Sequence, residues 1–324
     1  MDKEYILHIK NDNPAYGAEL EAFAGIPTFM RQPASRNLKG IDVAVVGIPF
    51  DGGAASFRSG TRMGPRKIRE YSLAIWGYNR VLDVGPLDVL NLVDYGDIAV
   101  QPPNIETTMG IIAREAQSIV NAGVKMISLG GDHSISYPLL KVHAAKYGPL
   151  ALVHFDSHCD TEEDYCNHGT PFADAYRSGL IDTSAHIKVG IRGPIFYSDE
   201  LKNAEQQGAR IFTIERCLED GIPAVIENIH DVIGDKRVYV SLDIDAVDPA
   251  YAPGTGTPEV GGFTSYQILQ LVRGLKGLNT VGFDLVEVSP PYDSPGDITS
   301  ILAANLAFEF LSLLALKRLE SQEA

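Results

Sequence analysis

Six ionisable residues in the middle of the chain come directly after short apolar segments. They are His133, Asp156, His158, Asp160, Asp243 and Asp245. The apolar segments before them, 126–129, 152–155 and 238–242, have the length and composition of buried β-strands. Because alternate residues of an extended strand point the same way, 156, 158 and 160 should face one direction, and 243 and 245 should do likewise. We therefore expect all six side chains to converge at one edge of a sheet.

A cluster of this kind needs positive charge. Like charges at close range repel each other, and no Lys or Arg adjoins these segment ends in the sequence. Two divalent metal ions would balance the four aspartates. Oxygen ligands with a minority of imidazole suit Mn²⁺, and Ni²⁺, Co²⁺ and Zn²⁺ are compatible alternatives. A lone Asp after a strand is usually a turn or cap residue, but the joint pattern of six predicts a dinuclear metal site.

The elements that must hold these residues alternate along the chain. Segments that read as buried strands are 42–48, 124–129, 150–155, 187–191, 211–214, 238–242 and 280–285. Helices are expected at 107–121, 137–146, 198–207, 224–232, 265–275 and 299–320, with Asp297 as the N-cap of the last. The strands are apolar on both faces, which is typical of a parallel sheet covered by helices on each side. The alternation predicts one doubly wound α/β domain, in which ligands bind beyond the carboxyl ends of the strands.

Composition and charge narrow the function further. The 324 residues include 27 Lys and Arg against 42 Asp and Glu, for a net charge of −15. Acidity without a basic cluster argues against a nucleic-acid partner and favours a cationic substrate, a bound metal or simple solubility. No stretch approaches about 20 uninterrupted apolar residues, so we expect no membrane span.

The rest of the chain suggests a simple organisation. Residues 1–38 are irregular and read as an N-terminal arm, and residues 39–324 read as a single domain. Three cysteines, Cys159, Cys166 and Cys217, are too few for a disulfide framework, which favours a cytoplasmic protein. The role of Cys159 and Cys166 stays open, a zinc or redox pair being the less favoured alternative.

Several motifs carry a family resemblance. They are GIPFDGG at 47–53, RSGTRMGPRKIRE at 58–70, GGDHS at 130–134, DSHCDT at 156–161, HGTPF at 168–172, SLDIDAVDPAYAPGTGTPEVGG at 241–262 and VEVSPPYD at 286–293. Together they resemble the ureohydrolase family, which includes arginase and agmatinase. HGTPF and GTGTPEVGG are more similar to the agmatinase and guanidinobutyrase branch than to arginase itself.

The resemblance implies an arginase-like three-layer α/β/α fold around a parallel sheet of about eight strands. It also implies two metal ions, most simply Mn²⁺ with Ni²⁺ as an alternative. One ion would be held by His133, Asp156, Asp160 and Asp243, and the other by Asp156, His158, Asp243 and Asp245. Relatives in this family are commonly trimers or hexamers, so a homo-oligomer is expected.

The resemblance further implies roles in hydrolysis of a guanidino compound to urea and an amine. Glu287 matches the carboxylate that binds the guanidinium, in a planar charge-assisted contact. His168 matches the proton shuttle, for which an imidazole is suited. Asp160 is a further candidate for taking a proton from the attacking water. The chain has Ser157 where the family commonly has Ala.

The substrate is less determined by the sequence. Glu162, Glu163 and Asp164 lie between Asp160 and His168, where they read either as a solvated charge run or as an acidic cavity entrance. An acidic entrance, with Glu163 as a substrate-binding residue, favours agmatine, and also admits guanidine or a biguanide. Arg192 favours the alternative, because it could receive the carboxylate of guanidinobutyrate or guanidinopropionate. A non-catalytic subunit of a ureohydrolase complex is the remaining alternative.

Three neighbouring features have structural interpretations. His154 is expected to face away from the Asp156 set, as a buried histidine that either supports the metal ligands or packs in the core. Arg58, Arg62 and Arg66, separated by glycines, are expected to form a structural loop with salt bridges. The segment 253–262, rich in Gly and Pro, predicts an ordered loop that crosses the metal site.

Overall fold

The computed structural model describes residues 21–54, 58–162, 165–195 and 197–323. They form an eight-stranded sheet of order β2-β1-β3-β8-β7-β4-β5-β6, in which every pair of neighbours is parallel. The strands are β1 (Val43–Ile48), β2 (Leu92–Asp97), β3 (Lys125–Gly130), β4 (Leu150–Phe155), β5 (Ile181–Ile191), β6 (Ala209–Thr213), β7 (Arg237–Asp243) and β8 (Asn279–Val286). The central strands β3, β8, β7 and β4 are those that precede the candidate site residues.

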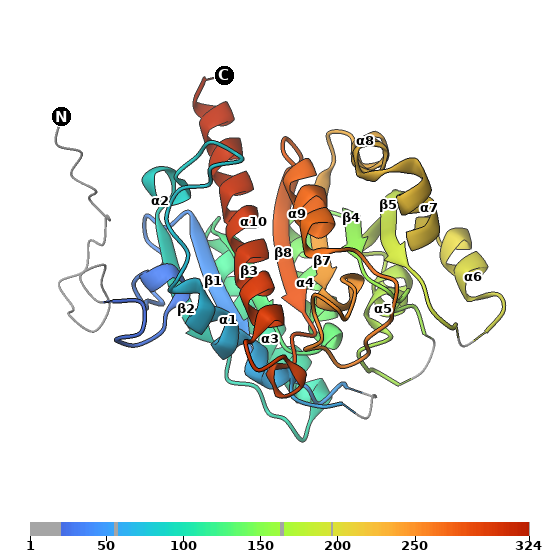
Figure 1. Ribbon diagram of the computed structural model, residues 1–324, viewed down its shortest axis with the longest axis horizontal. Coiled ribbons are helices and arrows are strands. Elements are labelled where there is room, and N and C mark those ends of the chain that lie inside the picture. Colours follow the sequence, from blue (N-terminus) through green and yellow to red (C-terminus); the bar gives the residue numbers. More distant parts are fainter. Residues whose placement is uncertain (1–20, 55–57, 163–164, 196, 324) are drawn as a thin grey trace.

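Helices cover both faces of the sheet, which confirms the predicted three layers (Figure 1). One face carries α1 (Gly64–Ser72), α7 (Ile214–Asp220), α8 (Ile222–Ile233), α9 (Ser265–Gly274) and α10 (Ile298–Glu323). The other carries α3 (Ile105–Asn121), α4 (Ser136–Tyr147) and α5 (Pro171–Arg177). The short helices α2 (Pro86–Val89) and α6 (Glu200–Gln206) complete the set in the described part of the chain.

Strand β4 shows how the sequence builds the two cores. Val153 and Phe155 pack into the core under α8, α9 and α10, whereas Leu150 and Leu152 pack into the core under α3 and α4. The alternation follows from the pleat of an extended strand. The same pleat places His154 on the face of Asp156, two residues farther on, and the two side chains are hydrogen-bonded. The expected opposite orientation of His154 was therefore wrong.

The last helix is the most apolar element. Its segment Ile298–Gln322 is long and apolar enough to cross a membrane, with a mean hydropathy of 1.8, but 83% of its window is buried inside the protein. It packs against α1, α2, α9 and β8, as a core helix does (Figure 1). Asp297 directly precedes the helix as predicted, and its carbonyl accepts the N–H of Ile301, but the side-chain cap is Asp293, whose carboxylate accepts the N–H groups of Thr299 and Ser300. The carboxylate of Asp297 instead bonds to Tyr71 and Lys67.

Five elements escaped prediction, namely β2, α1, α2, α5 and α7, and in two of them buried charges interrupt the apolar pattern. Strand β2 carries Asp94 and helix α1 carries Arg69, and both side chains are buried. Their ion pair joins the two elements, with 2.7 Å between Arg69 Nε and Asp94 Oδ2. The basic segment around Arg62 and Arg66 is therefore only partly a loop, since Arg66 lies in α1. The expected salt bridge is present between Arg62 and Asp51.

The described part of the predicted arm lies against the body of the protein. Phe29 and Met30 are buried in the core, and the N–H of Phe29 donates to Asp94 at 2.7 Å. The domain boundary at residue 38 stays a prediction.

Candidate metal centre and active site

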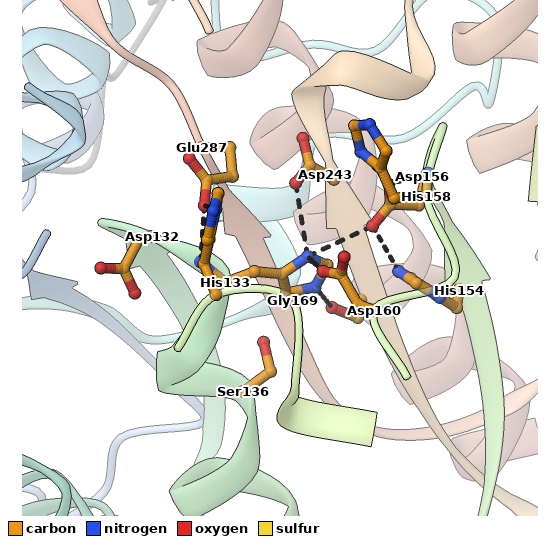
Figure 2. A network of polar contacts seen from close by, with 12 residues as sticks. Asp132, His133, Ser136, His154, Asp156, His158, Asp160, Gly169, Asp243 and Glu287 are labelled. Carbon is orange, nitrogen blue, oxygen red and sulfur yellow. Dashed lines mark hydrogen bonds and ion pairs between the residues drawn. The ribbon is translucent and has the colours of Figure 1, made fainter. Parts of the chain in front are cut away.

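The carboxyl ends of the four central strands bring the predicted residues together (Figure 2). His133 follows β3, Asp156 follows β4, Asp243 ends β7 and Glu287 follows β8. These strands are neighbours in the sheet although two of them lie far from the other two in the sequence. The convergence expected from the sequence is therefore present.

One cluster surrounds Nδ1 of His133. This atom lies 2.7 Å from Asp160 Oδ2, 3.2 Å from Asp156 Oδ2 and 3.3 Å from Asp243 Oδ2. It is fully buried, and no group in the described residues makes a well-formed hydrogen bond with it. The other ring nitrogen, Nε2, is held by Ser241 Oγ at 2.8 Å. An imidazole nitrogen that faces three carboxylate oxygens without a hydrogen bond fits a divalent cation.

A second cluster adjoins the first. His158 Nδ1 lies 3.1 Å from Asp245 Oδ2 and 3.5 Å from Asp156 Oδ1. Asp156 therefore presents one oxygen to each cluster, as a carboxylate between two metal ions would. Ser157, the departure from the family pattern, donates its hydroxyl to Asp245 Oδ1 at 2.7 Å. These contacts fit a second cation beside the first.

The charge balance of the clusters also fits cations. Burial opposes a charge on His133, yet the carboxylates of Asp160, Asp156 and Asp243 raise its pKa well above the usual value. Burial and the neighbouring Asp245 and Asp156 raise the pKa of Asp243 well above its usual range. In the protein alone, protons thus supply the positive charge that the carboxylates require. A site that holds protons so strongly is suited to divalent ions.

The backbone at these residues is less regular than predicted. Asp160 has a φ of 50° and Glu287 a φ of 63°, both in the left-handed region. The chain is therefore not extended through Asp160, and the alternation argument for 156, 158 and 160 was right about convergence but wrong about conformation. Asp243 accepts the N–H of Asp245 at 2.8 Å and so begins a short 3₁₀ turn. Strained backbone of this kind is concentrated at functional sites.

Glu287 and His168 lie side by side next to the clusters. Glu287 Oε1 is 3.1 Å from Nδ1 of His168 and accepts the N–H of His133 at 2.9 Å. The N–H of His168 donates to the carbonyl of Gly53, whose own N–H donates to Asp132 at 2.7 Å. Asp132 thus positions His168 through Gly53, a link between distant loops that the sequence did not reveal.

A cavity of about 400 Å³ opens over the site. His158, Asp160, Asp243 and His168 line it, so the two clusters and the predicted proton shuttle face the same space. Its other charged residues are Arg58, Glu162, Glu200 and Glu259. Thr257, from the predicted loop over the site, also lines it, with its hydroxyl 3.3 Å from Asp245. The predicted substrate-binding residue Glu163 lies outside the described residues.

Arg192 does not take the role proposed for it. Its guanidinium donates to backbone carbonyls on the loop over the site, among them those of Asp245 at 2.6 Å and Glu259 at 2.7 Å. It also donates to Ala246 and Val260. Arg192 therefore holds the 245–260 loop in place, and its donors are already used in that contact. The expectation that it could receive a substrate carboxylate was wrong.

Two buried residues lie behind the clusters: His154, for which a role in supporting the ligands was one expectation, and Lys188, which was not recognised. His154 Nε2 lies 2.7 Å from Asp156 Oδ2, and Lys188 Nζ lies 2.9 Å from His154 Nδ1. Burial and the nearby Lys188 lower the pKa of His154 to about 3, so its ring is neutral. Lys188 escaped notice because it sits within an apolar run.

The cysteines are free thiols, with Cys159 buried and Cys166 partly buried.

Taken together, two adjoining carboxylate and imidazole clusters at the carboxyl edge of a parallel sheet define a hydrolase-type metal site. Comparisons with known proteins agree. Residues 41–312 match the model of the arginase family. The chain is 44% identical over 316 residues to an agmatinase of Chromobacterium violaceum, covering 94% of this chain and 93% of that protein.

Two further relatives have sequence identities close to this value. A guanidinobutyrase of Pseudomonas aeruginosa is 40% identical over 321 residues, which cover 97% of this chain and 98% of that protein. The solved structure of the proclavaminate amidino hydrolase of Streptomyces clavuligerus has a TM-score of 0.88 at 41% identity, covering 91% of this chain and 99% of the other. The chain belongs to the arginase family and is a ureohydrolase, an enzyme of a binuclear metal-dependent family.

Proposed function

We propose that this ureohydrolase hydrolyses agmatine to urea and putrescine, with two Mn²⁺ ions bound at the clusters. One ion would be held by His133, Asp156, Asp160 and Asp243, and the other by Asp156, His158, Asp243 and Asp245. When bound, such ions supply a water-derived nucleophile at neutral pH. The mostly carboxylate donor set supports Mn²⁺, and Ni²⁺ is the alternative to be tested. A homo-oligomer and a cytoplasmic location stay predictions.

The chain's own residues then bind the substrate and move protons. Glu287 pairs with the guanidinium, whose planar N–H groups match a carboxylate. To do so it exchanges its present contact with His168 for one with the substrate. Asp160, a member of the first cluster that also lines the cavity, accepts a proton from the attacking water. His168 donates a proton to the departing amine, which must leave as a neutral molecule or a cation.

The acidic residues that line the cavity favour agmatine over the other guanidino substrates. Glu162, Glu200 and Glu259 line the wall around the site, against one arginine, Arg58. Burial and the nearby Asp160 raise the pKa of Glu162 above its usual value, which marks a carboxylate that a cation would stabilise. The far end of agmatine is an ammonium group, and a cationic tail complements this wall.

A panel of substrates tests the proposal. After loading with Mn²⁺ or with Ni²⁺, urea release is measured for agmatine, arginine, guanidinobutyrate, guanidinopropionate, guanidine and a biguanide. We expect the highest kcat/KM for agmatine, and we expect Glu162→Gln to lower it at least about threefold relative to guanidinobutyrate, the range of a partly exposed charge pair. Turnover of guanidine alone would refute the agmatine assignment, and no urea from any of these compounds would refute catalysis itself.

A guanidino acid is the second candidate, because Arg58 lines the same cavity. Its guanidinium lies 5.0 Å from the centre of the Tyr292 ring at the edge of the site. An arginine there would pair with the carboxylate of guanidinobutyrate, and one of the relatives described above is a guanidinobutyrase. Arg58→Gln would then lower guanidinobutyrate turnover and leave agmatine turnover unchanged or higher.

The His168–Glu287 contact makes a prediction about pH. Burial opposes a charge on the ring, but the hydrogen bond and charge of Glu287 raise the pKa of His168 to about 9. Since this pKa is raised above its unfolded value of about 6.5, the contact stabilises the fold fully below pH ~6.5 and is lost as pH rises through about 9. We expect NMR titration of the metal-free protein, assigned with His168→Gln, to give a value near 9.

The matched variant for this titration is Glu287→Gln. Removing the carboxylate charge should return the pKa of His168 toward about 6.5. A wild-type ring that already titrates near that value would contradict the ion pair.

A further inference from the structure

Lys188, in strand β5, is a lysine with no solvent exposure directly behind the clusters. Its Nζ lies 2.9 Å from Nδ1 of His154, 2.7 Å from the carbonyl oxygen of Cys159 and 4.3 Å from the centre of the Phe172 ring. A buried ammonium is costly unless its N–H groups are bonded. None of the steps proposed for the reaction uses this residue, so its presence here calls for another role.

The contact with His154 determines which ring nitrogen carries a proton. A lysine ammonium has three donors and no acceptor. Because Lys188 donates to Nδ1, that nitrogen must be the acceptor and the ring proton is on Nε2, 2.7 Å from Oδ2 of Asp156. The N–H of His158 donates to the other oxygen of Asp156 at 2.6 Å. The carboxylate that faces both clusters is therefore held in one orientation through His154.

The contact with Cys159 acts on the two neighbouring residues. Cys159 lies between His158 and Asp160, and Asp160 has the left-handed φ of 50°. A non-glycine residue adopts this conformation at an energetic cost and keeps it only where surrounding contacts require it. The hydrogen bond from Lys188 to the carbonyl that precedes Asp160 is such a contact. It fixes the turn that directs Asp160 toward His133.

We propose that Lys188 is a positioning residue for the dinuclear metal centre. It orients Asp156 through His154, and it orients His158 and Asp160 through the carbonyl of Cys159. Its ammonium also places a positive charge near Asp156 and Asp160, two of the four aspartates that repel one another. The inference rests on the ligand set proposed above and assigns Lys188 no contact with the substrate.

The first test compares two lysines. Lys188→Met removes the donors and keeps a chain of similar length. Lys125→Met is the matched control, because Lys125 is partly buried, donates to the carbonyl of Thr280 and lies at the start of β3, away from the site. Titration of metal-free protein with Mn²⁺, by calorimetry and by electron paramagnetic resonance, gives the affinity and the spin-coupled signal of a dinuclear centre.

We expect Lys188→Met to weaken Mn²⁺ binding by about 10- to 100-fold, the usual effect of losing a partner that orients metal ligands. The coupled signal should decrease at equal metal loading, and Lys125→Met should leave both unchanged. A Lys188→Met protein with a lower Tm but wild-type Mn²⁺ affinity would show a structural role only and overturn the proposal. A wild-type protein that binds fewer than two ions would instead refute the metal centre, and the inference with it.

A second pair of variants decides the question if Lys188→Met fails to fold. His154→Gln keeps an amide donor at the place of Nε2, toward Asp156. His154→Asn keeps a polar group at the place of Nδ1, toward Lys188, and loses the donor to Asp156. We expect His154→Gln to retain at least about tenfold tighter Mn²⁺ binding than His154→Asn. Equal affinities for the two variants would overturn the chain from Lys188 through His154 to Asp156.

Discussion

Replacing Asp243 with asparagine is expected to abolish the binding of both metal ions and the release of urea. Asp243 lies within 3.3 Å of Nδ1 of His133 and accepts the N–H of Asp245. Asparagine keeps the size of the side chain and an acceptor for that N–H, but it removes the charge. Loss of a residue that only orients a metal ligand weakens metal binding by about 10- to 100-fold. Because Asp243 is itself a proposed ligand, we expect the Mn²⁺ affinity to fall by more than about 100-fold and turnover to fall with it.

The effect on stability should have opposite signs with and without metal. Burial and the neighbouring carboxylates raise the pKa of Asp243 well above its usual range. An acid whose pKa is raised on folding destabilises the folded protein at any pH above its unfolded pKa. The metal-free Asp243→Asn protein should therefore unfold at the same or a higher temperature than the metal-free wild type. The wild type alone should gain about 2.7 kcal/mol per site at a metal concentration of 100 Kd.

Thermal unfolding after chelation and after addition of Mn²⁺, together with metal analysis, checks this prediction. Asp248→Asn is a suitable control, because Asp248 lies in the same segment but bonds to backbone N–H groups of its own loop, such as that of Gly261. It should keep two ions and its activity. An Asp243→Asn protein that retained two ions and turned over substrate would disprove the role of Asp243.

Glu287→Gln is expected to abolish guanidinium recognition while leaving metal binding intact. Glu287 is buried, with 1% of its surface exposed, and it lies beside the clusters without joining either of them. Truncating one partner of a buried charge pair costs about 2–5 kcal/mol, and each 1.4 kcal/mol is about a factor of ten. We therefore expect kcat/KM to fall by about 10²- to 10³-fold or more, with two Mn²⁺ ions still bound per chain.

Glu287→Asp is the informative companion. It keeps the charge and withdraws it by one methylene, and an aspartate tolerates the left-handed φ of 63° at this position. Its activity should lie between those of the wild type and Glu287→Gln. A Glu287→Gln enzyme with near wild-type kcat/KM, or one that loses its metal ions, would contradict the role assigned to Glu287.

The sequence was sufficient to predict the sheet-edge cluster because strand ends impose it. His133, Asp156 and Asp243 follow or end apolar runs, and the carboxyl ends of parallel strands share one edge. Two of the elements that escaped prediction, β2 and α1, contain a buried charge in place of an unbroken apolar pattern, namely Asp94 and Arg69. Within its own segment, each of these charged residues suggests a solvent-exposed position. The two charges are buried as a pair only when α1 packs beside β2.

The contacts that shape the site were beyond prediction for a related reason. Lys188 and Arg192 donate to backbone carbonyls and Asp132 accepts a backbone N–H, each across loops or strands, and no residue type or spacing predicts a backbone group as a partner. The partner of His154 could have been predicted. Alternate residues of a strand face the same way, so residue 154 lies on the side of Asp156. This alternation was applied to residues 156, 158 and 160 but not to residue 154.

The strand order has a consequence for how the protein reaches its active form. In the sheet, β2-β1-β3 and β4-β5-β6 form two three-stranded halves, and β7 and β8 lie between them. His133 belongs to the first half, Asp156 to the second, and Asp243 and Glu287 to the joining pair. During synthesis, the two halves emerge before the strands that connect them. A metal ion bound at the clusters would then link both halves to the joining strands, so that a native centre can exist only in a chain whose last strand is already in place.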